Sequence, residues 1–267
     1  MSDVRVLSPR PLPGTSLRVP CLGLGTVKLG RLGGLKYPAG QQRTSLPSDE
    51  EALQLLRAAH ELGVSLIDTA PAYGASESRL GGLLRRIAPR DSWTICTKAG
   101  EEWEGESSRF DFSAAAITGS VRRSLERLQS EWLDIVLLHM SGQVDDVEVL
   151  TRGEALGVLR DAQRAGLVRA VGASTSTPAG AALAVTQCDV VMLTLNSQHR
   201  ADLPAIASAS AHGVGVLVKK PLASGVDAPA ALPSVLRVPG VSAAVIGTSR
   251  PDHLREAVEA ARSCSTR

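Results

Sequence analysis

Short apolar runs alternate with segments of helical spacing along most of this chain. Within each run nearly every residue is apolar, rather than every second one, as is typical of strands buried on both faces of a parallel sheet. The predicted strands cover residues 21–26, 66–67, 94–97, 133–138, 168–172, 190–195, 214–218 and 243–246.

The segments between these runs are apolar at every third or fourth position, which predicts helices that pack one face on the sheet. They are expected from Ser48 onward, at 76–87, at 113–128, at 152–165, after Pro178, and at 203–212, 232–237 and 251–261. Ser48 with Glu51 three residues later forms a capping-box pattern. Residues 99–112 are expected to form a loop.

A pair of glycines near the N-terminus is also found in a different α/β fold, which must be considered. Gly23-Leu24-Gly25 follows an apolar residue, as in half of a dinucleotide-binding fingerprint. That fingerprint requires a helix directly afterwards, whereas the segment 30–40 holds four glycines and predicts a long loop. We therefore reject an open Rossmann fold.

Eight strand–helix units in a chain of 267 residues favour a closed barrel over an open sheet. Residues 4–7 and 17–19 flank a Pro/Gly turn and predict a small hairpin before the barrel. No linker or shift in composition divides the chain. We predict a single α/β domain over residues 1–267, a (β/α)8 TIM barrel with a short N-terminal β-hairpin.

Charge and cysteine usage exclude several classes of protein. A net charge of +2, without a run of five or more basic residues, gives no reason to expect nucleic acid. Neither a membrane span nor the basic-then-apolar pattern of a signal peptide occurs. The four cysteines lack metal-site or disulfide-framework spacing. These features predict a cytoplasmic protein with free thiols and no metal site.

Polar side chains follow consecutive predicted strands, at the barrel face where such folds carry their chemistry. Asp68 follows the strand at 66–67, and Tyr73 comes shortly after it; Lys98 and His139 follow the next two strands. Because an ammonium favours a phenolate, Lys98 is expected to depress the pKa of Tyr73, with Asp68 holding Lys98 charged. The set suits protonation of an oxygen while hydride reaches its carbon.

Each of these residues has a plainer interpretation when it is taken alone. A histidine after an apolar strand is more often structural, and a lysine there is usually a solvated loop residue. Four such residues at the ends of neighbouring strands favour a reactive site over coincidence.

In that order and at those places, Asp68, Tyr73, Lys98 and His139 resemble the catalytic tetrad of the aldo-keto reductase superfamily. The surrounding sequence is similar too, in GLGT at 23–26, IDTAPAYG at 67–74, TK at 97–98, LLH at 137–139, GAS at 172–174, PLASG at 221–225 and VIGTS at 245–249. The resemblance implies NADPH-dependent reduction of an aldehyde or ketone. Tyr73 would be the general acid, tuned by Lys98 and Asp68, and His139 would bind and polarise the carbonyl.

The resemblance also implies NADP(H) lying across the top of the barrel. Ser174 would contact the nicotinamide carboxamide, and the loop after the seventh strand would cover the pyrophosphate. At the start of the last helix, where phosphate is favoured, Arg250 and His253 would pair with a 2′-phosphate and Glu256 would meet the adenine. The implied cofactor-binding residues are Thr26, Asp68, Ser174, Thr175, Asn196, Pro221, Leu222, Gly225, Gly247, Thr248, Arg250, His253 and Glu256.

Three positions depart from the family pattern. The chain has Thr175 where the family often has asparagine, Met192 where it often has glutamine, and Leu195 where a tyrosine usually stacks on the nicotinamide. The lost stacking and amide hydrogen bond would weaken cofactor binding roughly tenfold or more. A non-catalytic barrel of this family, acting as a regulatory or partner-binding protein, is therefore the alternative hypothesis.

The substrate is expected to be a small-molecule carbonyl compound, and the oligomeric state stays open. Candidates for lining its pocket, with ordinary loop packing as an equal alternative, are Val27, Tyr37, Trp103, Phe110 and Met140. A lyase or isomerase with Lys98 as a Schiff-base amine ranks last, because Asp68 would keep Lys98 protonated.

Overall fold

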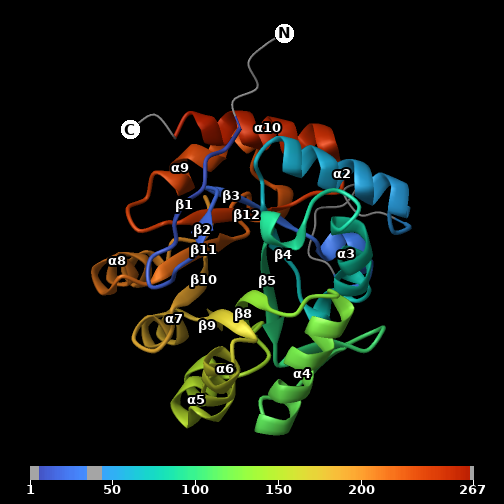
Figure 1. Ribbon diagram of the computed structural model, residues 1–267. Helices are drawn as coiled ribbons and strands as arrows, with labels where there is room; N and C mark the ends of the chain where they lie inside the picture. The colour runs from blue at the N-terminus through green and yellow to red at the C-terminus, as the bar shows by residue number, and fades with distance from the viewer. Residues whose placement is uncertain (1–5, 35–43, 265–267) are drawn as a thin grey trace.

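A closed barrel of eight parallel strands forms the centre of the computed structural model, which describes residues 6–34 and 44–264 (Figure 1). Around the ring the strands are β3 (Leu22–Gly25), β4 (Leu66–Asp68), β5 (Thr94–Ala99), β8 (Leu133–His139), β9 (Val168–Ser174), β10 (Val190–Thr194), β11 (Gly215–Lys219) and β12 (Ala243–Gly247). Pairing of β12 with β3 closes the ring. The predicted (β/α)8 fold is thereby confirmed.

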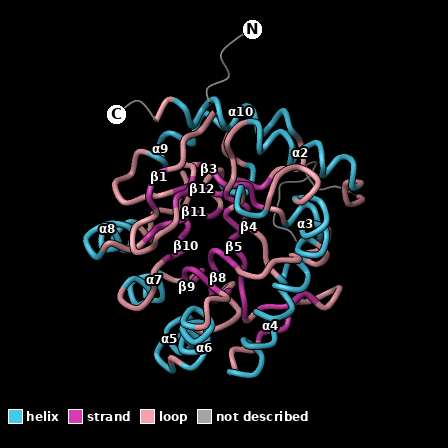
Figure 2. The backbone as a smooth tube through the Cα atoms, in the orientation of Figure 1, coloured by secondary structure: helices cyan, strands magenta, loops and turns pink. Residues whose placement is uncertain are grey.

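Helices surround the strands on the outside, as Figure 2 shows. They are α2 (Asp49–Glu61), α3 (Ser76–Leu84), α4 (Ala114–Arg127), α6 (Glu154–Arg164), α7 (Pro178–Val185), α8 (Leu203–His212), α9 (Leu232–Leu236) and α10 (Pro251–Arg262). The predicted capping box of α2 is present: Glu51 N–H donates to Ser48 Oγ at 3.1 Å, and Ser48 N–H donates to the Glu51 carboxylate at 2.7 Å. Every helix in the described residues is too short or too polar to cross a bilayer.

The barrel has two apolar cores, because successive side chains of a strand point to opposite faces. On β4, Leu66 belongs to the cluster inside the barrel and Ile67 to the cluster between barrel and helices. The inner cluster includes Leu12, Leu17 and Val19 from the N-terminal segment. That segment contains the predicted hairpin, formed by β1 (Arg10–Pro11) and β2 (Arg18–Val19). Its first strand therefore begins later than the predicted segment 4–7, of which residues 4 and 5 lie outside the described residues.

Three features are missing from the sequence-based prediction. The segment expected to be a loop folds into an antiparallel hairpin, β6 (Glu101–Trp103) with β7 (Ser108–Phe110), whose charged residues give no apolar run to detect. A helix α5 (Asp146–Arg152) precedes α6, and Gly153 separates the two in the left-handed conformation, with φ 71°. Likewise α1 (Val27–Gly30) is a single turn within the segment predicted as loop.

Candidate active site

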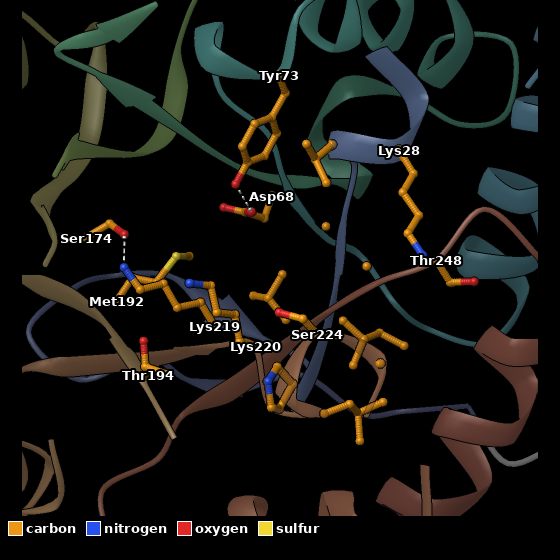
Figure 3. Close-up of a pocket in the computed structure, with 18 of the residues that line it drawn as sticks. Lys28, Asp68, Tyr73, Ser174, Met192, Thr194, Lys219, Lys220, Ser224 and Thr248 are labelled. Atoms are coloured by element: carbon orange, nitrogen blue, oxygen red, sulfur yellow. Dashed lines mark hydrogen bonds between the residues drawn. The ribbon is translucent and has the colours of Figure 1, made fainter. Parts of the chain in front are cut away.

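The four residues of the predicted tetrad come together at the C-terminal end of the barrel. Asp68 ends β4, Lys98 lies one residue before the end of β5, and His139 ends β8. Tyr73 sits on a one-turn 3-10 helix (Pro71–Tyr73) that begins with a proline, whose fixed φ and missing N–H suit a helix start. Figure 3 shows the Tyr73 hydroxyl turned toward Asp68 in the cavity.

Lys98 is the centre of this group. Its Nζ donates to Asp68 Oδ1 at 2.6 Å, to the Thr69 carbonyl at 2.8 Å and to the Tyr73 hydroxyl at 3.2 Å. An ammonium has three protons, so all its donors are occupied. Burial by itself would lower the pKa of Lys98, but the Asp68 carboxylate outweighs it and raises this pKa above the ordinary value. Lys98 therefore stays charged.

The pKa of Tyr73 differs from the sequence-based expectation. Burial of the phenol has the largest effect and raises its pKa above the ordinary 10.0, while Lys98 acts in the lowering direction without prevailing. The prediction of a depressed pKa is therefore wrong for the free protein, because desolvation penalises the phenolate more than Lys98 stabilises it. Tyr73 remains protonated and available as a proton donor.

His139 faces a carboxylate that the sequence analysis missed. Its Nδ1 lies 2.9 Å from Glu101 Oε2, and the other carboxylate oxygen accepts a hydrogen bond from Ser108 Oγ at 2.5 Å. Burial lowers the pKa of His139, opposed by Glu101. For Glu101, burial is outweighed by His139 and Ser108, and the pKa falls to about 2. The carboxylate 2.9 Å away favours a proton on the facing nitrogen of a neutral His139.

A cavity of about 1160 Å³ extends from these residues to α10. Most of the residues predicted to bind a cofactor line it, namely Asp68, Ser174, Pro221, Leu222, Gly225, Gly247, Thr248, Arg250, His253 and Glu256. Thr26, Thr175 and Asn196 do not; their side chains are buried in the protein.

The three buried residues hold the walls of the cavity in place. Thr26 donates from Oγ1 to the Asp68 carbonyl at 2.9 Å. The Thr175 carbonyl accepts from Lys219 Nζ at 2.6 Å. Asn196 donates to the Lys220 carbonyl at 2.9 Å. Each therefore positions the backbone or side chain of a residue that lines the cavity.

The end of β10 corrects one prediction. Leu195, expected at the position that stacks on the nicotinamide, is buried in the outer core with Leu193. Met192 and Thr194 line the cavity instead. The alternation along an extended strand explains this, since residues an odd number apart point to opposite faces.

The predicted substrate-pocket residues are only partly at the cavity. Val27 lines it, whereas Trp103, Phe110 and Met140 do not, and Tyr37 lies outside the described residues. Trp103 packs under Arg31, whose guanidinium carbon is 3.4 Å from the ring centroid. Arg31 itself lines the cavity and donates to the Ala72 carbonyl at 2.9 Å.

The loop after β11 carries backbone strain beside the cavity. Lys220, Ala223 and Ser224 have φ of 53°, 46° and 57°, in the left-handed region that residues other than glycine rarely adopt. Such conformations cost on the order of 1 kcal/mol or more each and cluster at ligand-binding loops. Lys220 and Ser224 both line the cavity.

The far end of the cavity is the N-terminus of α10, where helical N–H groups and the helix dipole favour anions. Gly247, Thr248, Arg250 and His253 line this end. The exposed guanidinium of Arg250 pairs with Asp252, with Nε 3.1 Å from Oδ1. An incoming anion would therefore compete with Asp252 for Arg250.

Sequence reasoning missed two charged residues at the tetrad end. Glu101 lies in the segment predicted to be a loop, and the signal for it is an acid three residues after Lys98, within reach of a histidine on the next strand. Lys219, at the end of β11, is the other; its Nζ donates to Ser174 Oγ at 3.0 Å (Figure 3).

Comparison with known proteins gives a consistent set of matches. The model of the aldo/keto reductase family matches residues 22–234. A solved structure of a candidate aldo-keto reductase from Pseudomonas aeruginosa is 44% identical, covers 100% of both chains and has a TM-score of 0.88.

Curated proteins match over a shorter part. The L-galactose dehydrogenase of Arabidopsis thaliana is 33% identical over 61% of this chain and 47% of its own length. The NADH-specific methylglyoxal reductase of Escherichia coli is 30% identical over 61% of this chain and 51% of its own length. The chain thus spans about half the length of the curated relatives it matches.

Proposed function

The chain belongs to the aldo/keto reductase family, and from that premise we propose that it is an NADP(H)-dependent oxidoreductase that reduces an aldehyde or ketone to an alcohol, with Tyr73 as general acid. One observation carries the proposal: a buried, charged Lys98 joins the Asp68 carboxylate to the Tyr73 hydroxyl at the end of a large cavity.

The cavity residues fit a nicotinamide dinucleotide. Gly25 and Gly247 lie side by side on β3 and β12 and present bare backbone to the cavity, so a flat group can approach closely. Lys28 and Lys220 bring positive charge, and Thr248 adds a hydroxyl at the N-terminus of α10. These groups would hold the phosphates, with Ser174 at the nicotinamide end. When bound, the cofactor supplies the hydride.

The chain's own residues would manage the proton and the carbonyl oxygen. Tyr73 is protonated and would donate its proton to the oxygen as negative charge develops there. Lys98 would stabilise the phenolate left behind, because its ammonium already contacts that oxygen. The Nδ1 of His139 faces Glu101. Its Nε2 could donate a hydrogen bond to the substrate carbonyl only if the ring changed its tautomer or became protonated. We therefore assign it mainly to orienting the substrate.

The substrate class follows from the lining near the tetrad. The side chains that line this region are charged or carry a hydroxyl or amide group: Arg31, Glu101, Ser108, Ser141 and Gln143. Such a surface favours a polar carbonyl compound over a long apolar one. The relatives' names, an L-galactose dehydrogenase and a methylglyoxal reductase, are both of enzymes for small polar molecules.

Titration of the purified protein with NADPH and NADH, followed by fluorescence or calorimetry, tests the proposal. We expect micromolar binding of NADPH and weaker binding of NADH, and then carbonyl-dependent NADPH oxidation with a panel of small polar aldehydes. Absence of binding by either cofactor would overturn the enzyme hypothesis and favour the non-catalytic alternative.

A further inference from the structure

Lys219 is a second cation at the tetrad end of the cavity, with no role in the proton transfer proposed above. It ends β11, and its Nζ donates to Ser174 Oγ at 3.0 Å and to the Thr175 carbonyl at 2.6 Å. Two of the three ammonium protons are used in this way, which leaves one for a ligand. In Figure 3 the Lys219 amine and Ser174 lie across the cavity from Tyr73 and Asp68.

Unlike Lys98, Lys219 forms no ion pair with any carboxylate in residues 6–34 and 44–264. Its pKa is lowered to about 8, chiefly by burial and also by the positive charges of Lys220 and Lys98, while Asp146 and Asp202 act in the opposite direction. The charge of Lys219 in turn contributes to the lowered pKa of His139. Lys219 therefore acts electrostatically on the same space as the tetrad.

The next step rests on the proposed function. A hydride donor must reach the carbon whose oxygen faces Tyr73, so the nicotinamide ring must lie beside Tyr73 and His139. The remainder of the cavity, toward α10, is then left for the phosphates. A ring placed in this way lies between Tyr73 and the opposite wall, which Ser174 and Lys219 form.

The ring changes its charge during the reaction. A bound reduced nicotinamide would be neutral, and the oxidised form, left after hydride transfer and protonation of the carbonyl oxygen by Tyr73, would carry one positive charge. A nearby ammonium repels that charge, and such repulsion is strong where water is largely excluded.

We propose that Lys219 makes this protein discriminate between the redox states of its cofactor, so that the reduced form binds more tightly than the oxidised form. By linkage, the equilibrium between the two bound states shifts by the same factor toward carbonyl compound and reduced cofactor. Lys219 would thus lower the population of the complex with oxidised cofactor and make oxidation of the alcohol thermodynamically more favourable on the protein.

The pH dependence has a definite sign. Below pH 8 Lys219 is mostly charged and disfavours the oxidised cofactor; above pH 8 it loses its proton and the penalty disappears. The ratio of the two dissociation constants, oxidised over reduced, is therefore high at pH 7 and falls toward pH 9. Phosphate contacts are common to both forms and cancel in this ratio.

The experiment measures dissociation constants of NADP⁺ and NADPH at pH 7 and pH 9 for the wild-type protein, Lys219→Met, Lys219→Arg and Lys28→Met. We expect Lys219→Met to lower the ratio at pH 7 by about tenfold and to remove its pH dependence. Lys219→Arg keeps its charge, so its ratio should stay high at pH 9. Lys28→Met, on another wall of the same cavity, should weaken both forms alike.

Two results would overturn the inference. A wild-type ratio that does not change between pH 7 and pH 9 would do so without any variant. An equal fall of the ratio in Lys28→Met and Lys219→Met would assign the effect to the overall charge of the cavity. Failure of the proposed function looks different, since neither cofactor form would then bind the wild-type protein at any pH.

Discussion

The Lys98 ammonium and the Asp68 carboxylate meet at 2.6 Å where water hardly reaches, with side-chain exposures of 1% and 5%. Lys98 also donates to the Thr69 carbonyl and to the Tyr73 hydroxyl, so its position is fixed by three contacts. A charged pair in such a place costs desolvation free energy, which only good geometry repays. The pair is therefore better understood as a means of holding a charge beside Tyr73 than as a source of stability.

Breaking this pair from one side should be costly. In Asp68→Asn the buried Lys98 charge loses its counter-ion, and we expect the free energy of unfolding to fall by about 3 to 5 kcal/mol. The double variant Asp68→Asn/Lys98→Met removes the stranded charge and should recover part of that loss. Urea unfolding of the wild type, both single variants and the double variant measures the coupling. Additive effects would contradict a directly coupled pair.

Tyr73→Phe tests the role proposed for the phenol. The variant keeps the ring and loses the proton donor, so turnover should fall by a factor of about 10² to 10⁴. Cofactor affinity should stay nearly unchanged, because the hydroxyl makes its contacts with Lys98 and Asp68. Steady-state rates and a cofactor titration on the same preparation measure both quantities. Wild-type turnover would exclude Tyr73 as the general acid.

The sequence predicted well where the strands end. It predicted less well whether a side chain points into the barrel or toward the helices. Asp68, Lys98 and His139 follow apolar runs, and parallel strands of a barrel end on one face, so their meeting follows from the pattern. The family pattern predicts Leu195 beside the nicotinamide, whereas the inside–outside alternation along β10 and the residue after it turns this side chain into the outer core.

The balance between opposing effects on a pKa, and contacts made through loops, were harder to predict from the sequence. The raised pKa of Tyr73 depends on how deeply the phenol is buried, which only packing determines. Glu101 reaches His139 through a hairpin of charged residues, and such a hairpin has no apolar periodicity. The sequence thus indicated which groups meet, and the structure was needed to show which effect prevails.

Glu101→Gln should alter stability in a pH-dependent manner. The pKa of Glu101 is about 2 in the folded protein, against an ordinary value of 4.5. A depressed carboxyl pKa stabilises the fold above pH 4.5, and this contribution is lost as the pH falls toward 2. The wild type should therefore exceed Glu101→Gln by on the order of 2 kcal/mol at pH 7, and the difference should shrink at pH 3. Urea unfolding at both pH values measures it. A difference that grows on acidification would contradict the proposed pairing.

Gly172 in β9 should tolerate no side chain. A Cβ there would lie 1.7 Å from the Val190 carbonyl oxygen on the neighbouring strand, so Gly172→Ala must push two barrel strands apart. We expect a loss of several kcal/mol or failure to fold. Gly157, inside α6, has nothing within 4 Å of its Cβ position, and Gly157→Ala should stabilise by up to about 1 kcal/mol. Thermal unfolding compares the two; similar behaviour would contradict the packing described for β9.

Arg250 and Asp252 should set the preference between NADPH and NADH. Asp252 holds the guanidinium of Arg250 in the free protein, so it competes with a 2′-phosphate for the same donors. Asp252→Asn removes that competitor and should strengthen NADPH binding several-fold, while NADH, which lacks the 2′-phosphate, should bind as before. Arg250→Met should weaken NADPH binding by about tenfold with NADH again unaffected. Both residues are exposed, so the effects should diminish in high salt. Calorimetric titration of the wild type and both variants with each cofactor measures these affinities. Equal changes for NADPH and NADH would show that Arg250 does not contact the 2′-phosphate. The cofactor preference would then depend on other residues at the start of α10.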